Sequence, residues 1–389
     1  MKEPKIRIKG FQGEWEEKNI GSFCSISIGE FVIKTKQRAN APYPVYNGGS
    51  TNTGYYDQYN QIGPKVIVSA RGANAGFVNK EEGKYWAGNS CYSIGTNDET
   101  NWLFLYYAFK FYQDMYIKAQ QAANIPSVSK SDIQKTILLF PSISEQQSIA
   151  SYFQHLDSLI QSTTKKIESL KQVKAASLQS MFPQEGETTP RVRFKGFEGE
   201  WSICPLKYFA KKSTEKNISM DYTITLTNSA EYGVINQRDF FDHDISNDDH
   251  INGYYVIHHD DFVYNPRVST AAPVGPISRN RLGYSGVMSP LYLIFRVNGI
   301  NKDFLSYYFK TTLWHNYMKL EGNTGARFDR LAISDEQFFN MPIYYPKDEE
   351  EQTAIASYFT NLDRQITLHT QRLEKLKQIK SACLDNMFV

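Results

Sequence analysis

Ile6-Arg7-Ile8-Lys9-Gly10-Phe11-Gln12-Gly13-Glu14-Trp15 stands near the start of the chain and returns as Val192-Arg193-Phe194-Lys195-Gly196-Phe197-Glu198-Gly199-Glu200-Trp201. A second stretch, Glu145-Gln146-Gln147-Ser148-Ile149-Ala150-Ser151-Tyr152-Phe153, returns as Glu351-Gln352-Thr353-Ala354-Ile355-Ala356-Ser357-Tyr358-Phe359. Solenoid repeats have periods of about 20–50 residues, so this much longer spacing indicates a duplicated domain. Two copies of one unit predict a pseudo-two-fold molecule, which suits a target with two halves.

The bulk composition is that of a globular chain. Its 389 residues are 41% hydrophobic and 22% charged, which allows two domains of ordinary size. The formal net charge is only +2, whereas a protein that grips long DNA unaided is usually more basic. If DNA is the target, the basic residues are concentrated on one face or partners supply part of the grip.

Redox chemistry and membranes leave no clear mark on the sequence. The cysteines, none in a CxxC pair, are Cys24, Cys91, Cys204 and Cys383. This spacing favours neither a zinc site nor a disulfide framework. The first residues lack an apolar signal region, and the apolar stretch 102–109 is far too short to span a bilayer. We therefore expect a soluble cytoplasmic protein with no membrane partner.

Local patterns predict an α+β unit in each half. In residues 16–144, short β-type runs at 66–68 and 92–94 are followed by a helical pattern from Thr100 to Lys118. Residues 202–349 repeat this plan, with strands predicted at 262–264 and 291–295 and a helix from Asp303 to Leu320.

Residues 145–182 and 351–388 predict two long helices. Apolar residues recur there at heptad positions, although Thr163, Lys174 and Lys380 interrupt the seam. Each helix would extend about 57 Å. We expect the two helices to pair antiparallel, with one domain at each end of the pair and the C-terminus beside the opening motif, Ile6 to Trp15, whose second copy is Val192 to Trp201. The alternative is that each helix packs only on its own domain. The predicted seam residues are Leu156, Ile160, Ile167, Leu170, Leu362, Ile366, Leu373 and Leu376.

The chain resembles the specificity (S) subunit of Type I restriction–modification enzymes. The resemblance rests on the two repeated motifs and on Tyr43-Pro44-Val45-Tyr46-Asn47-Gly48-Gly49, Asp261-Phe262-Val263-Tyr264-Asn265-Pro266-Arg267 and Gly286-Val287-Met288-Ser289-Pro290-Leu291-Tyr292. It implies target-recognition domains at 1–144 and 190–350, and spacer helices at 145–189 and 351–389. Each domain would read half of a bipartite duplex site. It further implies that the helices, through the seam residues above, set the gap and bind methyltransferase subunits, two of them, with restriction/translocase subunits in the larger assembly. S-adenosylmethionine, ATP and Mg are expected on those partners only, and no further C-terminal element is expected.

Catalytic motifs give weaker signals. Asn265-Pro266 invites comparison with amino-methyltransferases, but Arg267 and Val268 follow where Pro and an aromatic residue are needed, so a strand-end turn is favoured. No P-loop appears. The Asp/His-rich stretch at 242–261 lacks a typical ligand spacing and favours a charged loop over a metal site. A stand-alone metal-dependent nuclease and a protein-only coiled-coil scaffold remain as rival hypotheses.

Base reading requires Arg, Lys, Asn or Gln side chains on a scaffold that enters a groove. When the strands at 66–68 and 262–264 are aligned, Arg71 coincides with Arg267, each just after a strand and before a Gly-containing turn. For any single residue, ordinary surface solvation is the alternative. The predicted DNA-binding residues are Lys36, Arg38, Arg71, Asn74, Asn265, Arg267, Arg279, Arg281, Asn323, Arg327 and Arg330, of which Lys36 and Arg38 would contact phosphates.

Overall fold

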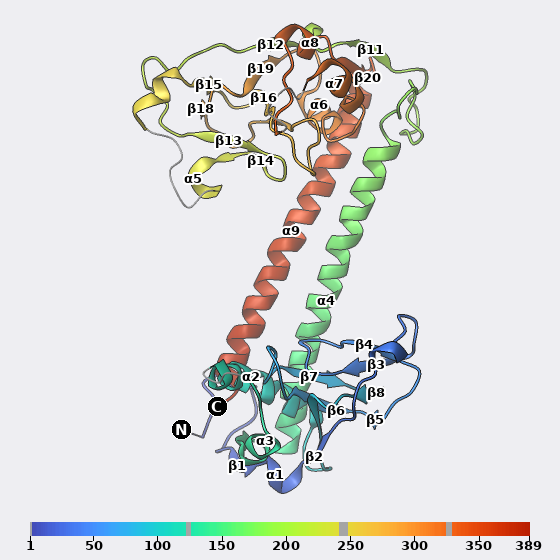
Figure 1. Cartoon of the computed structure of the whole chain (residues 1–389). Helices are drawn as coiled ribbons and strands as arrows, with labels where there is room; N and C mark the ends of the chain where they lie inside the picture. The colour runs from blue at the N-terminus through green and yellow to red at the C-terminus, as the bar shows by residue number, and fades with distance from the viewer. Residues whose placement is uncertain (1, 122–125, 241–247, 324–328) are drawn as a thin grey trace. The chain divides into compact units, whose positions relative to one another are not determined.

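The chain folds into two compact units, each assembled from segments far apart in the sequence. A computed structural model describes residues 2–121, 126–240, 248–323 and 329–389. The first unit comprises Met1–Lys166 and His369–Val389, and the second comprises Ile167–Leu368 (Figure 1). The end of the chain therefore belongs to the same unit as its beginning.

The first unit is an α+β domain. Its strands are β1 (Glu16–Asn19), β2 (Ser25–Ile28), β3 (Tyr43–Tyr46), β4 (Gly54–Tyr56), β5 (Gln61–Ile62), β6 (Lys65–Ser69), β7 (Val78–Glu81), β8 (Lys84–Ala87), β9 (Cys91–Gly95) and β10 (Ile137–Phe140). Its short helices are α1 (Ile20–Phe23), η1 (Lys34–Lys36) and α3 (Lys130–Lys135), and the longer α2 (Trp102–Gln121) packs on β6 and β7. The sheets have the orders β2-β9-β6-β7, β4-β3-β8-β5 and β1-β10, and only the β3–β8 pairing is parallel among the described strands.

The second unit repeats this plan with smaller additional sheets. Its strands are β11 (Ser202–Pro205), β12 (Ala210–Lys212), β13 (Leu226–Ser229), β14 (Gly233–Asn236), β15 (Tyr255–Ile257), β16 (Phe262–Tyr264), β17 (Ile277–Arg279), β18 (Gly286–Met288), β19 (Leu293–Val297) and β20 (Pro342–Tyr345). Its shorter helices are η2 (Leu206–Tyr208), α5 (Gln237–Phe240), η3 (Asp248–Gly253), α6 (Lys302–Tyr308), α7 (His315–Glu321) and α8 (Asp335–Phe339). The sheet β12-β19-β16-β17 has the same order as the sheet β2-β9-β6-β7 of the first unit. The predicted strands 66–68 and 262–264 are buried central strands of these two sheets, within β6 and β16 respectively.

Two long helices, α4 (Ile143–Ser180) and α9 (Glu349–Met387), confirm the helical predictions. In the first unit, Lys380 pairs with Asp157, and the Tyr152 hydroxyl lies 3.4 Å from the Cys383 sulfur. Residue numbers rise along one helix as they fall along the other, so these segments are antiparallel (Figure 1).

The second unit has the equivalent antiparallel contacts. Lys174 pairs with Asp363, and the Ser177 and Tyr358 hydroxyls lie 2.9 Å apart. The aspartate also accepts a hydrogen bond of 2.9 Å from the Tyr307 hydroxyl of α6. The lysines that interrupt the heptad seam are therefore partners of aspartates on the facing helix.

The repeated motifs meet each other in space. In the first unit, Arg7 donates two hydrogen bonds of 2.8 Å to the Glu145 carboxylate and one of 2.6 Å to the Gly13 carbonyl. The Gln146 side chain accepts a hydrogen bond of 3.0 Å from the Asn101 amide, just before α2. The Glu-Gln pair thus links the start of α4 to both the opening motif and the start of α2.

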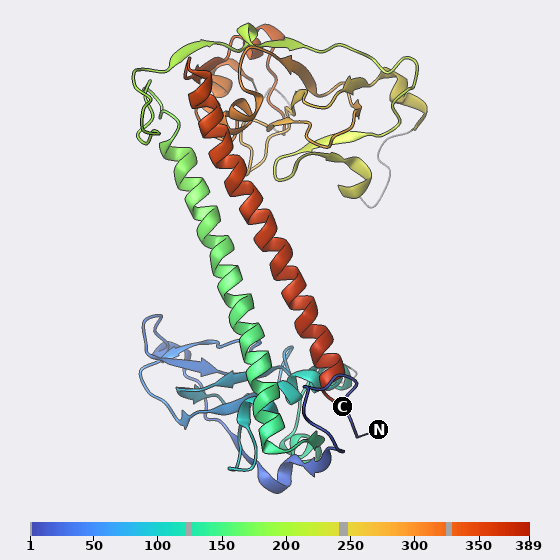
Figure 2. The same ribbon diagram turned by 180° about the vertical axis from the view of Figure 1, so that it is seen from behind.

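The end of each long helix returns to an opening motif. The Ile6 amide donates to the Asn386 carbonyl (2.9 Å), and the Val192 amide donates to the Ser180 carbonyl (2.8 Å). Both chain ends lie together in the first unit (Figures 1 and 2), which confirms the predicted proximity of the C-terminus to the opening motif. Phe388 and Phe182 pack into equivalent aromatic clusters, which they form with Trp15, Phe104 and Phe153 and with Trp201, Phe304 and Phe359.

One expectation is corrected. The helix predicted from Asp303 to Leu320 is broken into α6 and α7, because the Thr311 hydroxyl and the Trp314 indole N–H donate to the carbonyls of Tyr308 (2.7 Å) and Phe309 (3.2 Å). The partner-binding role given to the seam residues stays a prediction. The seam residues buried in the chain's own fold are Leu156, Ile167, Leu170 and Leu362. The half-buried seam residues are Ile160, Ile366, Leu373 and Leu376.

No helix in the described ranges combines the length and apolar composition needed to cross a membrane.

Candidate nucleic-acid interface

Arg71 and Arg267 occupy matching places after the central strands β6 and β16. Arg71 forms an isolated antiparallel bridge with Ser127, and Arg267 forms one with Arg330. Both arginines are exposed, while the backbone beneath each is held by two hydrogen bonds of 2.8–3.1 Å across the bridge. Each domain therefore presents an arginine from a fixed backbone position, as the strand alignment predicted.

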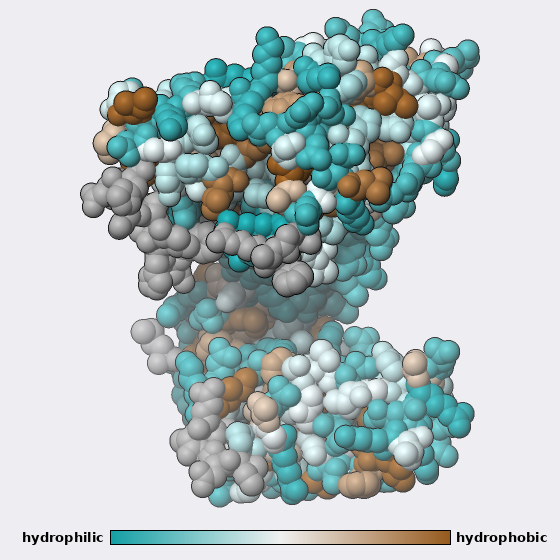
Figure 3. Space-filling view, turned by 45° about the horizontal axis from the view of Figure 1, so that its top comes forward, coloured by the Kyte–Doolittle hydropathy of each residue, from teal (hydrophilic) through white to brown (hydrophobic). Residues whose placement is uncertain are grey.

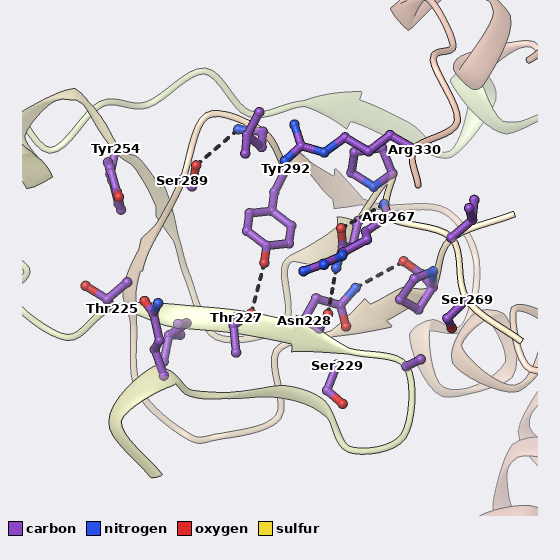
Figure 4. Close-up of a pocket in the computed structure, with 18 residues that line it drawn as sticks. Thr225, Thr227, Asn228, Ser229, Tyr254, Arg267, Ser269, Ser289, Tyr292 and Arg330 are labelled. Carbon is purple, nitrogen blue, oxygen red and sulfur yellow. Dashed lines mark hydrogen bonds between the residues drawn. The ribbon is translucent and has the colours of Figure 1, made fainter. Parts of the chain in front are cut away.

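In the second unit, this position borders a cleft of about 480 Å³. The cleft brings together three of the predicted residues, Asn265, Arg267 and Arg330, although Arg330 is distant in sequence. In Figure 4, the two arginine side chains extend from the same side of the cleft toward Tyr292. Their backbone pairing explains this proximity, because bridge partners in antiparallel chains lie opposite one another.

The floor of the cleft is held by amide side chains. Asn265 donates a hydrogen bond of 2.9 Å to the Asn228 carbonyl and accepts one of 3.0 Å from the Arg267 amide. Asn228 is buried and donates to the carbonyls of Val263 and Pro276, both at 3.1 Å. Asn265 is therefore engaged in positioning the loop that carries Arg267, and Pro266 restricts that loop further.

Sequence reasoning missed most of the polar lining. The Tyr292 and Thr227 hydroxyls lie 2.9 Å apart on the opposite wall. Tyr292 belongs to a motif that carried the family resemblance, but the two residues come from separate strands and loops with no shared spacing, so the sequence did not place them in one site. The missed polar residues that line the cleft are Thr225, Thr227, Asn228, Ser229, Gln237, Tyr254, Ser269, Ser289 and Tyr292.

Arg279 and Arg281 lie in an ion-pair network. Arg279 contacts Asp260 (Nε–Oδ1 2.8 Å) and Asp303 (2.9 Å), and its side chain is only 12% exposed. Arg281 also contacts Asp303, at 2.5 Å. These pairs join β17 to the start of α6, and the base-reading role predicted for the two arginines would require them to break.

The remaining predicted residues are dispersed. Lys36 and Arg38 are exposed at and just after η1. The Asn74 side chain is half-buried and donates to the Gly48 carbonyl at 3.4 Å. Asn323 forms an isolated bridge with Ala332, and Arg327 lies outside the described residues.

The described part of the Asp/His-rich stretch forms a charged network. Arg296 pairs with Glu215 (2.7 Å) and Asp261 (3.3 Å), and His258 lies 3.1 Å from Glu215. The hydrogen bond from Arg296 lowers the pKa of Glu215, whereas burial raises the pKa of Asp261. Residues 242–247 of this stretch lie outside the described ranges. Among the residues that the structure describes, no three His, Cys, Asp or Glu side chains are placed to hold a metal ion.

Comparison with known proteins identifies the family. The type I restriction modification DNA specificity domain matches twice, over residues 12–172 and 200–378. A protein named as a type I specificity subunit of Mycoplasma pneumoniae is 25% identical over 168 residues, and that match spans 42% of this chain and 44% of the relative's length. The specificity subunit of a type I restriction enzyme from Methanocaldococcus jannaschii is 22% identical over 403 residues, covering 96% of this chain and 91% of that one.

A solved structure has the same fold. The crystal structure of a type I restriction–modification S subunit from M. genitalium superposes with a TM-score of 0.67 at 18% identity, covering 100% of this chain and 99% of that chain. The two family matches fall on the two copies of the repeat, and together they span most of the sequence. The chain belongs to the type I restriction modification DNA specificity domain family.

Proposed function

We propose that this chain is the DNA-specificity subunit of a Type I restriction–modification system and has no catalytic activity of its own. Each recognition domain would read one half of a bipartite duplex site. The observation that carries the proposal is the duplicated family domain in which each copy presents an exposed arginine after its central strand, at Arg71 and at Arg267. Arginine can donate two hydrogen bonds to guanine in the major groove.

The proposal assigns chemistry to partners. Methyltransferase subunits, two per chain, would dock on exposed faces of α4 and α9, and restriction/translocase subunits would join the larger assembly. S-adenosylmethionine, ATP and Mg would be bound by those subunits. A partner contribution to DNA binding is consistent with the net charge of only +2.

Co-expression with a type I methyltransferase subunit, followed by sequencing of modified bases, tests this proposal. We expect methylation at two constant segments separated by a fixed gap, and no methylation by the purified chain alone. Turnover by the chain without its partner, or methylation at a continuous unsplit site, would refute the proposed division of labour.

A further inference from the structure

The segment between β2 and β3 in the first unit exposes large apolar side chains. Phe31 is 71% exposed and Ile33 is 42% exposed, while Val32 between them is buried against Val45 and Tyr56. On the face drawn in Figure 3, hydrophobic side chains stand in small groups among hydrophilic ones. Phe31 keeps most of its surface in contact with water and is available to a ligand.

This segment is held in one backbone conformation. The Tyr56 hydroxyl accepts a hydrogen bond from the Ile33 amide (2.6 Å) and donates one to the Ile33 carbonyl (2.8 Å). The Glu30 amide donates to the Ala87 carbonyl at 2.9 Å. Because this backbone is already fixed, little conformational entropy would be lost when a ligand binds the Phe31 ring.

Three cations follow directly. Lys34, Lys36 and Arg38 are all exposed, and in the described ranges the structure gives none of them an ion-pair partner. Glu30 supplies the only nearby acidic residue in the segment 29–38. An exposed aromatic ring close in sequence to three unpaired cations complements a ligand that carries many negative charges and also exposes apolar groups. A DNA duplex offers both, the charges on its phosphates and the apolar groups in the thymine methyls of its major groove, and it therefore fits better than a protein surface.

We propose that the segment from Phe31 to Arg38 contacts the DNA duplex, with the Phe31 ring packed on the C5-methyl group of a thymine and the three cations on phosphates. Phenylalanine makes this contact in the major groove, where the methyl group distinguishes thymine from the other bases. The inference rests on the proposed function and adds a specificity-determining residue to the first half-site.

The test uses the chain in complex with its methyltransferase subunit and a duplex carrying the mapped site, with each thymine of the first half-site replaced in turn by uracil. We expect one replacement to weaken binding by the wild-type chain about fourfold, the effect of one buried methyl group, and to leave binding by Phe31→Ala unchanged. Phe31→Leu should retain most of the discrimination. Ile62→Ala, at a 58% exposed residue of β5 on the far edge of the β4-β3-β8-β5 sheet, is the matched control.

Salt dependence separates the two kinds of contact. Replacing Lys34, Lys36 or Arg38 with Gln should each lower the slope of log affinity against log salt by about 0.9, whereas Phe31→Ala should leave the slope unchanged. A first half-site with no A·T pair, an unchanged uracil response in Phe31→Ala, or loss of the methyltransferase subunit in place of DNA affinity would overturn the inference. Failure of the wild-type complex to bind any specific duplex would instead overturn the proposed function.

Discussion

Arg193 donates two hydrogen bonds of 2.7 Å to the carboxylate of Glu351, which is only 1% exposed. The pair joins the second opening motif to the start of α9, and Arg7 with Glu145 forms the equivalent pair in the first unit. Removing one member of a buried pair leaves the other charge uncompensated, which costs far more than the pair contributes net. The two repeated motifs are therefore parts of one structural joint.

Arg193→Ala should destabilise the second unit by about 3–5 kcal/mol, because it leaves Glu351 buried without its partner. Arg191→Ala is the control, since Arg191 is 66% exposed and pairs with Glu187, four residues earlier, so its loss should cost less than about 1 kcal/mol. Guanidinium denaturation followed by tryptophan fluorescence measures both. Equal losses in the two variants would show that the buried pair has no special role.

Alkaline pH should destabilise the protein through its buried tyrosines. Burial raises the pKa of Tyr307 to about 12, with a further contribution from Asp363, and burial also raises the pKa of Tyr107. Between the unfolded value near 10 and the folded value, only the unfolded chain releases the proton, so stability is lost as pH rises through this window. The melting temperature should fall steeply above pH 10, and less steeply in Tyr307→Phe.

Two lysines act with the opposite sign at lower pH. Partial burial lowers the pKa of Lys110 and of Lys310 to about 8, with Lys380 and Lys174 respectively as the neighbouring charges. The Lys310 side chain is 49% exposed, so solvent screens it and its contribution is the smaller of the two. The unfolded chain then binds more protons at these lysines between pH 8 and about 10.4, so their contribution to stability rises over that range. Burial raises the pKa of Cys24 and Cys91 to about 12, and these thiols act in the opposite direction above pH 9. The lysine contribution is therefore measured as the difference in melting temperature between the chain and Lys110→Met, and an identical pH dependence in both would contradict the assignment.

Arg71→Ala and Arg267→Ala should each weaken specific binding by about 1–3 kcal/mol and relax base preference in one half-site only. Arg279→Ala is the internal comparison, because Arg279 already pairs with Asp260 and Asp303. It should lower the melting temperature without changing base preference. Competition binding against single-base variants of the mapped site measures these effects, and an equal loss on random duplex would identify phosphate contacts instead.

Strong local patterns and the duplication allowed much of the fold to be predicted. The central strands at 66–68 and 262–264 read as continuous apolar runs because both faces are buried. The prediction of one helix from Asp303 to Leu320 was wrong. Periodicity does not reveal that the side chains of Thr311 and Trp314 donate hydrogen bonds to backbone carbonyls at the end of α6.

The cleft was predictable only in part. Arg267 could be identified from its place after a strand, but the pairing of its backbone with that of Arg330 is a long-range contact with no local signature. Arg279 is of a residue type that commonly contacts bases, and only the structure shows that it forms ion pairs with Asp260 and Asp303. The contact between Tyr292 and Thr227 could not be predicted because it depends on the fold, although Tyr292 belongs to a motif of the family resemblance.

Exchange of residues 202–349 for the matching segment of a relative should change one half-site and leave the other as it was. No residue of that segment belongs to the first unit. The donor segment must preserve contacts that cross its boundary, among them those of Asn301 with Gln352 (2.8 Å) and of Tyr307 with Asp363 (2.9 Å). Mapping of methylated sites decides the outcome, and a change in both halves would show that the domains do not read independently.

An insertion in α4 tests whether the helices set the gap between half-sites. Four residues added near Thr163-Thr164 would lengthen the helix by about 6 Å. Along α4, this region lies between Asp157, which pairs with Lys380 in the first unit, and Lys174, which pairs with Asp363 in the second unit. The two charged pairs are 17 residues apart on α4 and 17 residues apart on α9, so the variant also carries four added residues near Leu373-Glu374 of α9, which keeps the two spans equal and lets both pairs form. A coiled coil absorbs a four-residue stutter by local unwinding.

The added length is close to two base pairs at about 3.4 Å each. We expect both half-site sequences to be unchanged and the gap to grow by one or two base pairs in the mapped methylation sites. A four-residue insertion in the segment 184–189, after α4 has ended, is the control and should leave the gap as it was. If the variant in α4 keeps full activity with the original gap, the spacing is fixed by something other than these helices.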